Sequence, residues 1–356
     1  MTVVANSLGP RRLLSTALLL AVAAMFLVTL VAATGSSRLA PDFRWGYLDA
    51  AHSVRAGESP YASDDDQFDY LYPPVLAEAL VPLTVFPDDV SSFFAFAASV
   101  AAVMGALAVV GVRDVRCYAA VVIWAPAWNT FEIANVTGLL TLLSAVVWRY
   151  RDARWRSAAA LGAALCLKLF LWPLAVWAAA TRRLRIAGPA LAIGVGLALV
   201  SWAVIDFTGF TSYPDVLRGQ PFEDSYSLVG IAAALGLDQG VGRVATAVVG
   251  GSLLAATIHL GRRQEEQRAF LCAIFASLAL SPVLWLHYFA VLSVPLAIAR
   301  PRFCALWLLP IVLWMCPRSG NGDGVQPFVP AIVVSVFIVA LVLWPNAGRR
   351  VSEAPA

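Results

Sequence analysis

The sequence predicts an all-α polytopic membrane protein, and three observations support this fold class. Hydrophobic residues make up 60% of the 356 residues and charged residues only 13%, well below the roughly 25% that is typical of soluble domains. Several apolar runs approach or reach the length of about 20 residues that a helix needs to cross a bilayer. Arginine accounts for all but one of the 25 basic residues and occurs mostly in clusters between those runs. These features are not those of a soluble enzyme.

The first apolar run, residues 13–33, follows Arg11 and Arg12 and is succeeded by small residues. A secretory signal shows a similar order, but its apolar core is only roughly 7–15 residues long. The run here has 21 residues, which fits a complete span. We therefore expect a retained first transmembrane helix.

Further apolar runs predict the remaining helices. The run at 303–317 is short, and two longer regions, 157–180 and 269–299, are interrupted by prolines, the first also by Lys168. Runs that reach or nearly reach the length of a span lie at 91–111, 115–131, 133–148, 186–205, 240–260 and 327–345.

The arginine clusters predict the topology. Eighteen of the 24 arginines lie at 11–12, 113–116, 149–156, 182–185, 262–268, 300–302 and 349–350. Because positively charged loops remain in the cytoplasm, every segment between two clusters has to leave that side and return. Residues 269–299 then form a hairpin, and 157–180 form a broken hairpin with its tip near Lys168, where irregular backbone needs protein or water around it. We expect about ten to twelve transmembrane or re-entrant helices in one domain, 1–348, and a cytoplasmic tail, 349–356.

With this orientation, residues 35–90 form a long extracytoplasmic loop that carries ten acids against three arginines. Its apolar positions recur at helical spacing, which predicts an amphipathic helix at the membrane surface; they are Phe43, Tyr47, Ala50 and Val54. A second short helix is expected from Pro74 to Phe86, because proline is favoured in the first turn.

Polar side chains at membrane depth are candidates for function, because lipid burial is costly for them. Here they occur at outward loops and hairpin tips, namely at Asp42, Glu132, Asn135, Lys168, Glu223, Ser227 and His287. An outward-facing cavity lined by acids, one lysine and one histidine would suit a reaction between a lipid-linked donor and an acceptor outside the cytoplasm.

Six sequence blocks, taken in order, make the chain resemble glycosyltransferase family 87. They cover most of residues 40–300 and read DFRWGYLDAAHSVRAGESPY, FDYLYPPVLAEALVPL, NVTGLL, ALCLKLFLWPLAVW, SYSLVGIAAALG and SPVLWLHYFAVLSVPL. The resemblance implies a GT-C-type catalytic domain over 1–348 and an inverting enzyme that uses polyprenyl-phosphate sugars. Mannose is the expected sugar, with arabinofuranose as the alternative. The acceptor is expected to be a lipid-linked glycan or glycolipid at the outer face of the plasma membrane.

The resemblance also implies roles for individual residues. The acid of the family's first loop corresponds to Asp42, which would take the proton of the acceptor hydroxyl as general base; the alternative is a helix cap. His287, Lys168 and Arg44 are expected to bind the donor phosphate. The alternatives are an interfacial histidine and a lysine that extends to the membrane surface. Candidate contacts to the acceptor or the sugar are Asp49, Tyr47, Tyr72, Glu132, Asn135 and Trp285.

No cofactor is expected beyond the donor itself, and no metal, because the expected phosphate-binding cations make one unnecessary. The acids at 64–66 resemble a metal-binding cluster, but three consecutive acids are more typical of a solvated loop. The sequence shows no glycine-rich phosphate loop and no basic stripe for nucleic acid. A transporter or flippase of lipid-linked sugars is the alternative outside the enzymes, and it predicts symmetric halves with polar residues on both sides of the bilayer. A structural scaffold, the third alternative, leaves Lys168 unexplained.

Overall fold

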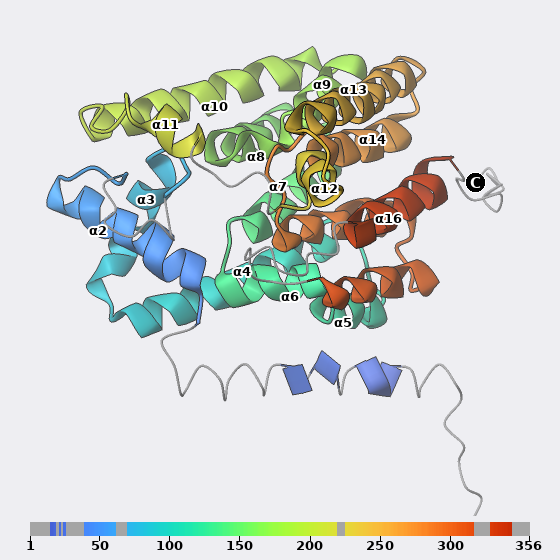
Figure 1. The fold of residues 1–356 in the computed structure, drawn as a ribbon, viewed down its shortest axis with the longest axis horizontal. Coiled ribbons are helices and arrows are strands. Elements are labelled where there is room, and N and C mark those ends of the chain that lie inside the picture. The colour runs from blue at the N-terminus through green and yellow to red at the C-terminus, as the bar shows by residue number, and fades with distance from the viewer. Residues whose placement is uncertain are drawn as a thin grey trace, which may run out of the picture.

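The chain forms an assembly of helices (Figure 1) in a computed structural model that describes residues 15–18, 21–22, 24–25, 39–61, 70–218, 225–316 and 328–343. Helices are the only regular secondary structure in these residues. This confirms the predicted all-helical class. Most of the expected first span at 13–33, the acids at 64–66, Glu223 and the tail at 349–356 lie outside the described residues.

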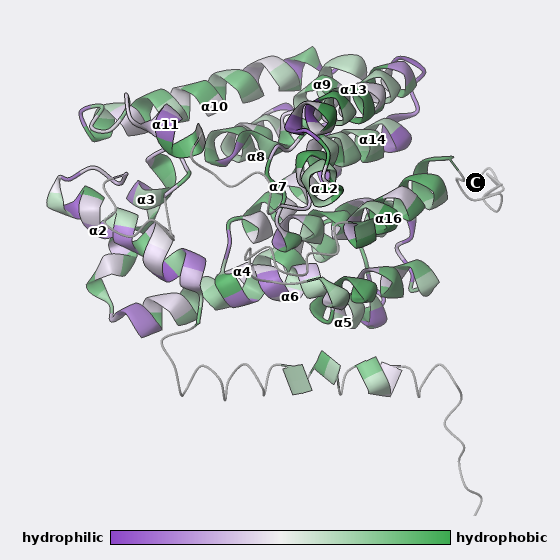
Figure 2. Cartoon of the chain, in the orientation of Figure 1, coloured by the Kyte–Doolittle hydropathy of each residue, from purple (hydrophilic) through white to green (hydrophobic). Residues whose placement is uncertain are grey.

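Three of the described helices are long and apolar enough to cross a bilayer alone: α4 (Asp88–Val109), α10 (Leu184–Val204) and α13 (Gln239–Arg262). They coincide with expected spans, and their length and composition support a membrane protein. Their outer faces expose apolar side chains such as Val195 and Val248, and hydrophobic residues run along α10 in Figure 2. The larger count of ten to twelve transmembrane or re-entrant helices stays a prediction.

The described segment 39–61 is helical where the apolar spacing predicts a helix. It consists of η1 (Asp42–Leu48), which has π-helical hydrogen bonding, and α2 (Asp49–Ala56), which ends at Gly57 with a φ of 76°. Phe43, Tyr47 and Ala50 are buried on one face. The helix expected from Pro74 is also confirmed, as α3 (Val75–Leu80) followed by the 3-10 helix η2 (Val81–Val85).

The span expected at 115–131 is wrong as a single helix. The structure divides it into α5 (Val115–Val122) and α6 (Ala125–Ile133). Trp124 between them is extended, and its indole N–H donates to the carbonyl of Trp307 at 2.7 Å. Pro126, in the first turn of α6, lacks the N–H that a continuous helix would need. After α6 the chain turns through 118° into α7 (Thr137–Arg149).

The broken hairpin expected at 157–180 is confirmed. α8 (Arg154–Leu167) ends before Lys168, whose backbone is extended, and the chain continues in η3 (Leu169–Leu171) and α9 (Pro173–Ala180). Arg183, just after α9, donates to the carbonyl of Arg151 at 3.1 Å. The two ends of the hairpin therefore meet, and Lys168 lies at its tip.

The other described helices complete the fold. The region 269–299, expected as a hairpin, contains α14 (Glu266–Ala279), a non-helical segment, and then the 3-10 helix η4 (Leu286–Leu292) continued by α15 (Ser293–Ala299). The rest are α11 (Tyr213–Arg218), α12 (Leu228–Ala234), η5 (Ala305–Met315), α16 (Phe328–Phe337) and η6 (Ile338–Leu343).

Contacts join the described arginine clusters one to the next. Glu266 pairs with Arg151 at 3.3 Å and with Arg183 at 2.7 Å. Arg268 and Arg300 donate to carbonyls of η6. The carboxylate at 114 links Arg116 to the backbone of Phe303. These clusters therefore gather at one end of the fold, as the predicted topology requires.

Candidate functional site

Asp42 is brought against the corner between α6 and α7. Ala40, with a φ of 57°, donates its backbone N–H to the carbonyl of Glu132 at 2.9 Å, which anchors the start of η1 to the end of α6. Asp42 is the first residue of η1, and its side chain does not cap that helix. Instead, its Oδ2 accepts a hydrogen bond from Asn135 Nδ2 at 2.8 Å. The helix-cap alternative is therefore not what the structure shows.

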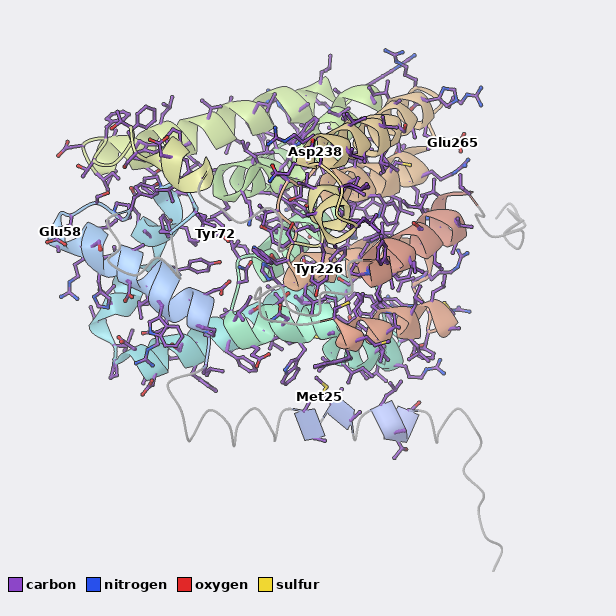
Figure 3. The ribbon with its side chains drawn as sticks, in the orientation of Figure 1. Met25, Glu58, Tyr72, Tyr226, Asp238 and Glu265 are labelled. Carbon is purple, nitrogen blue, oxygen red and sulfur yellow. The ribbon has the colours of Figure 1, made fainter. Side chains whose placement is uncertain are left out.

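A chain of hydrogen bonds leads from this pair toward the hairpin tip. Asn135 Nδ2 also donates to the hydroxyl of Tyr47 at 2.9 Å, and that hydroxyl donates to Tyr72 at 3.0 Å. The two tyrosine rings meet edge to face with their centroids 5.1 Å apart. In Figure 3, Tyr72 is labelled between the part of the fold formed by α2 and α3 and the part that contains α7 and α8.

Lys168 continues the network on the other side of Tyr72. Its Nζ lies 5.2 Å from the centroid of the Tyr72 ring and 4.3 Å from that of Tyr288, and it donates a hydrogen bond to the Tyr288 hydroxyl. Two aromatic faces thus attract the ammonium. Lys168 forms no ion pair with a carboxylate within the part of the chain that the structure describes.

His287 lies next to this aromatic pair. Its ring centroid is 4.8 Å from that of Tyr288, and the residue is 6% exposed. Its carbonyl accepts from the hydroxyl of Thr130, which holds η4 against α6. The buried Nε2 has no hydrogen-bond partner among the described residues, so this nitrogen is available to a ligand.

Burial changes the proton affinity of Asp42. It raises the pKa of the carboxyl from its ordinary 3.8 to about 6, although the hydrogen bond from Asn135 and the charge of Lys168 both act to lower it. The pKa of a base works best near the operating pH. Asp42 is therefore better matched to proton abstraction at neutral pH than an ordinary surface aspartate.

The structure gathers only some of the candidate site residues into this network, which consists of Asp42, Tyr47, Tyr72, Asn135, Lys168 and His287 with Tyr288 between the last two. Arg44 instead pairs with Asp89 at 2.5 Å and with Asp88 at 3.6 Å. Asp49 is exposed on α2, Glu132 ends α6 as the backbone anchor of Ala40, and Trp285 immediately precedes η4. The roles suggested for these four residues stay predictions.

One residue of the network, Tyr288, and one residue that bonds to it, Thr137, were not among the candidates from sequence. Tyr288 supplies the hydrogen-bond acceptor for Lys168, and Thr137 donates twice to the side-chain oxygen of Asn135, from its N–H at 2.9 Å and its hydroxyl at 2.8 Å. Tyr288 follows His287 directly in the sequence, and an ammonium at depth needs an acceptor. Those two facts together could have identified it.

The comparisons with known proteins concern the region around this network. The sequence model of glycosyltransferase family 87 matches residues 70–282, more than half of the chain. The matched region contains Tyr72, Asn135 and Lys168, whereas Asp42 precedes it and His287 follows it. No curated protein and no solved structure matches the chain.

Proposed function

Because the chain belongs to glycosyltransferase family 87, we propose that it transfers mannose from a polyprenyl-phosphate donor to a lipid-linked or glycolipid acceptor at the outer face of the plasma membrane. Polyprenyl-phosphate arabinofuranose is the alternative donor. No metal enters this reaction, and an inverted configuration is expected at the anomeric carbon.

One observation carries the proposal. A carboxylate, Asp42, and an ammonium, Lys168, belong to one network through Asn135, Tyr47 and Tyr72, and neither forms an ion pair in the part of the chain that the structure describes. A buried charge that lacks an ion pair is costly, and a ligand would offset this cost. An acceptor hydroxyl next to the carboxylate and a phosphate next to the ammonium would satisfy both.

The proposed reaction uses these groups in one displacement. Asp42 takes the proton of the acceptor hydroxyl while the hydroxyl oxygen bonds to the anomeric carbon. The bond from that carbon to the phosphate oxygen breaks, and its electron pair leaves with the phosphate. Lys168 and the free Nε2 of His287 would stabilise the charge on the departing phosphate. The network thus supplies both the base and the anion-binding groups.

The placement of the arginine clusters supports an outward-facing site. α8 has 14 residues, from Arg154 near the joined clusters to Leu167 beside Lys168, and a helix of that length spans about 21 Å. Lys168 therefore lies well away from the arginine end of the fold. Because arginine-rich ends remain cytoplasmic, we propose that the network opens to the opposite side.

The test is transfer by purified protein reconstituted in lipid. Synthetic polyprenyl-phosphate mannose and polyprenyl-phosphate arabinofuranose are offered separately to wild type, Asp42→Asn, Asp42→Ala and Asp238→Asn. Loss of a general base lowers the rate roughly 10²–10⁴-fold, so both Asp42 variants should lose nearly all transfer. Asp238 is an exposed helix cap that bonds the N–H of Gly240, and asparagine caps equally well, so Asp238→Asn should keep full activity.

Two outcomes would contradict the proposal at different levels. Near wild-type transfer by Asp42→Asn would show that Asp42 is not the base. Absence of transfer from either donor by the wild type, combined with movement of lipid-linked sugar between leaflets, would replace the enzyme with a transporter. The donor that supports turnover decides between mannose and arabinofuranose.

A further inference from the structure

The corner between α6 and α7 fixes the backbone of Asn135. Ala134 adopts a left-handed conformation with a φ of 49°, and the chain turns through 118° there. The N–H of Asn135 donates to Thr130 at 3.2 Å, and its carbonyl accepts from Gly138 at 3.2 Å. Asn135 is thus tied to the helices on both sides of the corner.

The orientation of the Asn135 amide is also fixed. Its Oδ1 accepts two hydrogen bonds from Thr137, and both hydrogens of Nδ2 are used, on Asp42 and on Tyr47. The reversed amide would set its oxygen against the carboxylate and its NH₂ against the two donors of Thr137. With the side chain 5% exposed, water could not compensate for those losses. The amide is therefore locked with its donors toward Asp42.

Asn135 is the only donor to the Asp42 carboxylate within the described parts of the chain. The hydroxyl of Tyr47, which shares the Asn135 Nδ2 donor with Asp42, gives its hydrogen to Tyr72 instead. Asn135 holds one carboxylate oxygen, Oδ2. The second oxygen, Oδ1, accepts no hydrogen bond from a described residue and keeps its lone pairs for another donor.

We propose that Asn135 is the positioning residue of the Asp42 base and does not contact the sugar. It holds Oδ2 so that Oδ1 presents itself to the acceptor hydroxyl, and it keeps the carboxylate ionised in a buried setting. The inference rests on the proposed role of Asp42 and replaces the acceptor contact expected of Asn135 from sequence.

A hydrogen bond from an amide to a carboxylate is stronger than one to a neutral carboxylic acid. Asn135 therefore stabilises the form of Asp42 that accepts a proton. During transfer the acceptor proton bonds to Oδ1, while Nδ2 remains the donor to Oδ2. Nothing else at Asn135 has to change, because its amide neither gains nor loses a proton.

The experiment compares Asn135→Ala, Thr137→Val and Thr141→Val in the reconstituted full-length protein. Thr137→Val removes the hydroxyl that holds Asn135 Oδ1 and retains the N–H bond. Thr141→Val is the matched control, because Thr141 lies one turn along α7 and donates to the carbonyl of Thr137 without touching Asn135. The first readout is the dependence of kcat on pH, and the second is an infrared titration of the protonated Asp42 carboxyl, identified as the band that Asp42→Asn lacks.

In the wild type the acid limb of kcat should lie near pH 6, the pKa of Asp42. Loss of a hydrogen bond to a charged group should raise the acid limb and the infrared pKa by about one to two pH units in Asn135→Ala. Thr137→Val should give a smaller shift in the same direction, and Thr141→Val none. At a pH above the acid limbs of both the wild type and Asn135→Ala, the variant should still show a lower kcat, because its carboxylate is no longer oriented.

The two readouts separate this inference from the proposed function. An infrared pKa that is the same in wild type, Asn135→Ala and Thr137→Val overturns the positioning role, whatever the transfer rates are. If the wild type transfers no sugar but Asn135→Ala raises the infrared pKa of Asp42, the contact with Asp42 is supported and the glycosyl-transfer proposal is rejected. Equal loss of activity at every pH, without an infrared shift, would mean that Asn135 acts on substrate or on folding only.

Discussion

Replacement of Asp42 by asparagine should stabilise the protein at neutral pH while it removes the proposed base. Burial raises the pKa of Asp42 from 3.8 to about 6. The folded protein therefore binds more protons than the unfolded chain between these values, and stability falls as the pH rises through this window. The loss of folding stability caused by the ionised carboxyl reaches about 3 kcal/mol above pH 6, because each pKa unit corresponds to about 1.4 kcal/mol.

Asparagine removes this penalty because it carries no charge, and its amide oxygen can still accept the hydrogen bond from Asn135. The stability gain of Asp42→Asn should be about 3 kcal/mol at pH 8, and the same relation gives about 1.6 kcal/mol at pH 5 and about 0.5 kcal/mol at pH 4. The gain should therefore shrink steadily on acidification, as the wild-type carboxyl becomes protonated.

Denaturant unfolding in lipid nanodiscs at pH 8, 5 and 4 measures this difference for wild type, Asp42→Asn and the control Asp238→Asn. The control replaces an exposed cap, so its stability should follow that of the wild type at all three values. If Asp42→Asn is no more stable than wild type at pH 8, the Asp42 carboxylate does not carry the proposed desolvation penalty. A gain that does not change with pH would also contradict that penalty, because the gain would then come from packing and not from the desolvated carboxylate.

Three further variants test other contacts. Lys168→Met should raise the KM for the donor about 10- to 100-fold, as expected for a lost bond to a charged group, with little change in the KM for the acceptor; equal changes would argue against a phosphate contact. Tyr288→Phe should cost about 1–3 kcal/mol of stability because it leaves the ammonium of Lys168 without its acceptor, and this cost should disappear in the Lys168→Met background. Gly162→Ala should destabilise the protein by about 1–3 kcal/mol, because its new methyl group would lie 2.7 Å from Ile193 and 2.8 Å from the carbonyl of Ala190 on α10. The control is Gly196→Ala on α10, whose new methyl group meets nothing within 4 Å, so this variant should be neutral or more stable by up to about 1 kcal/mol. Similar losses in both glycine variants would contradict the close packing of α8 on α10.

The features that could be predicted from the sequence depend on local patterns. The apolar spacing at Phe43, Tyr47 and Ala50 identified η1 and α2, since helix periodicity is visible within a few turns. A lysine inside an apolar run shortly before Pro173 identified the tip of the broken hairpin. Both signals come from residues that lie close together in the chain.

The features that could not be predicted depend on distant contacts. The division of 115–131 into two helices is fixed partly by the bond between Trp124 and Trp307, which are 183 residues apart. Asn135 was a candidate contact to sugar, yet its bond to Asp42 crosses 93 residues. The phosphate role expected of Arg44 stays a prediction, but its ion pairs with two acids at the start of α4 could not be predicted from the sequence. Single-residue chemistry gives no information about which of several partners a side chain will meet.

The bond between Lys168 and Tyr288 has a consequence for how the protein is made. Its two residues are 120 positions apart, so a ribosome finishes the hairpin that carries Lys168 long before the tyrosine that accepts its hydrogen bond exists. During that interval the ammonium lacks this acceptor, and of its two aromatic neighbours only Tyr72, from an earlier segment, has been made. Synthesis rates are about 5–20 residues per second, so the interval lasts on the order of 6–24 seconds. Chains that end within it should be preferred targets of membrane quality control.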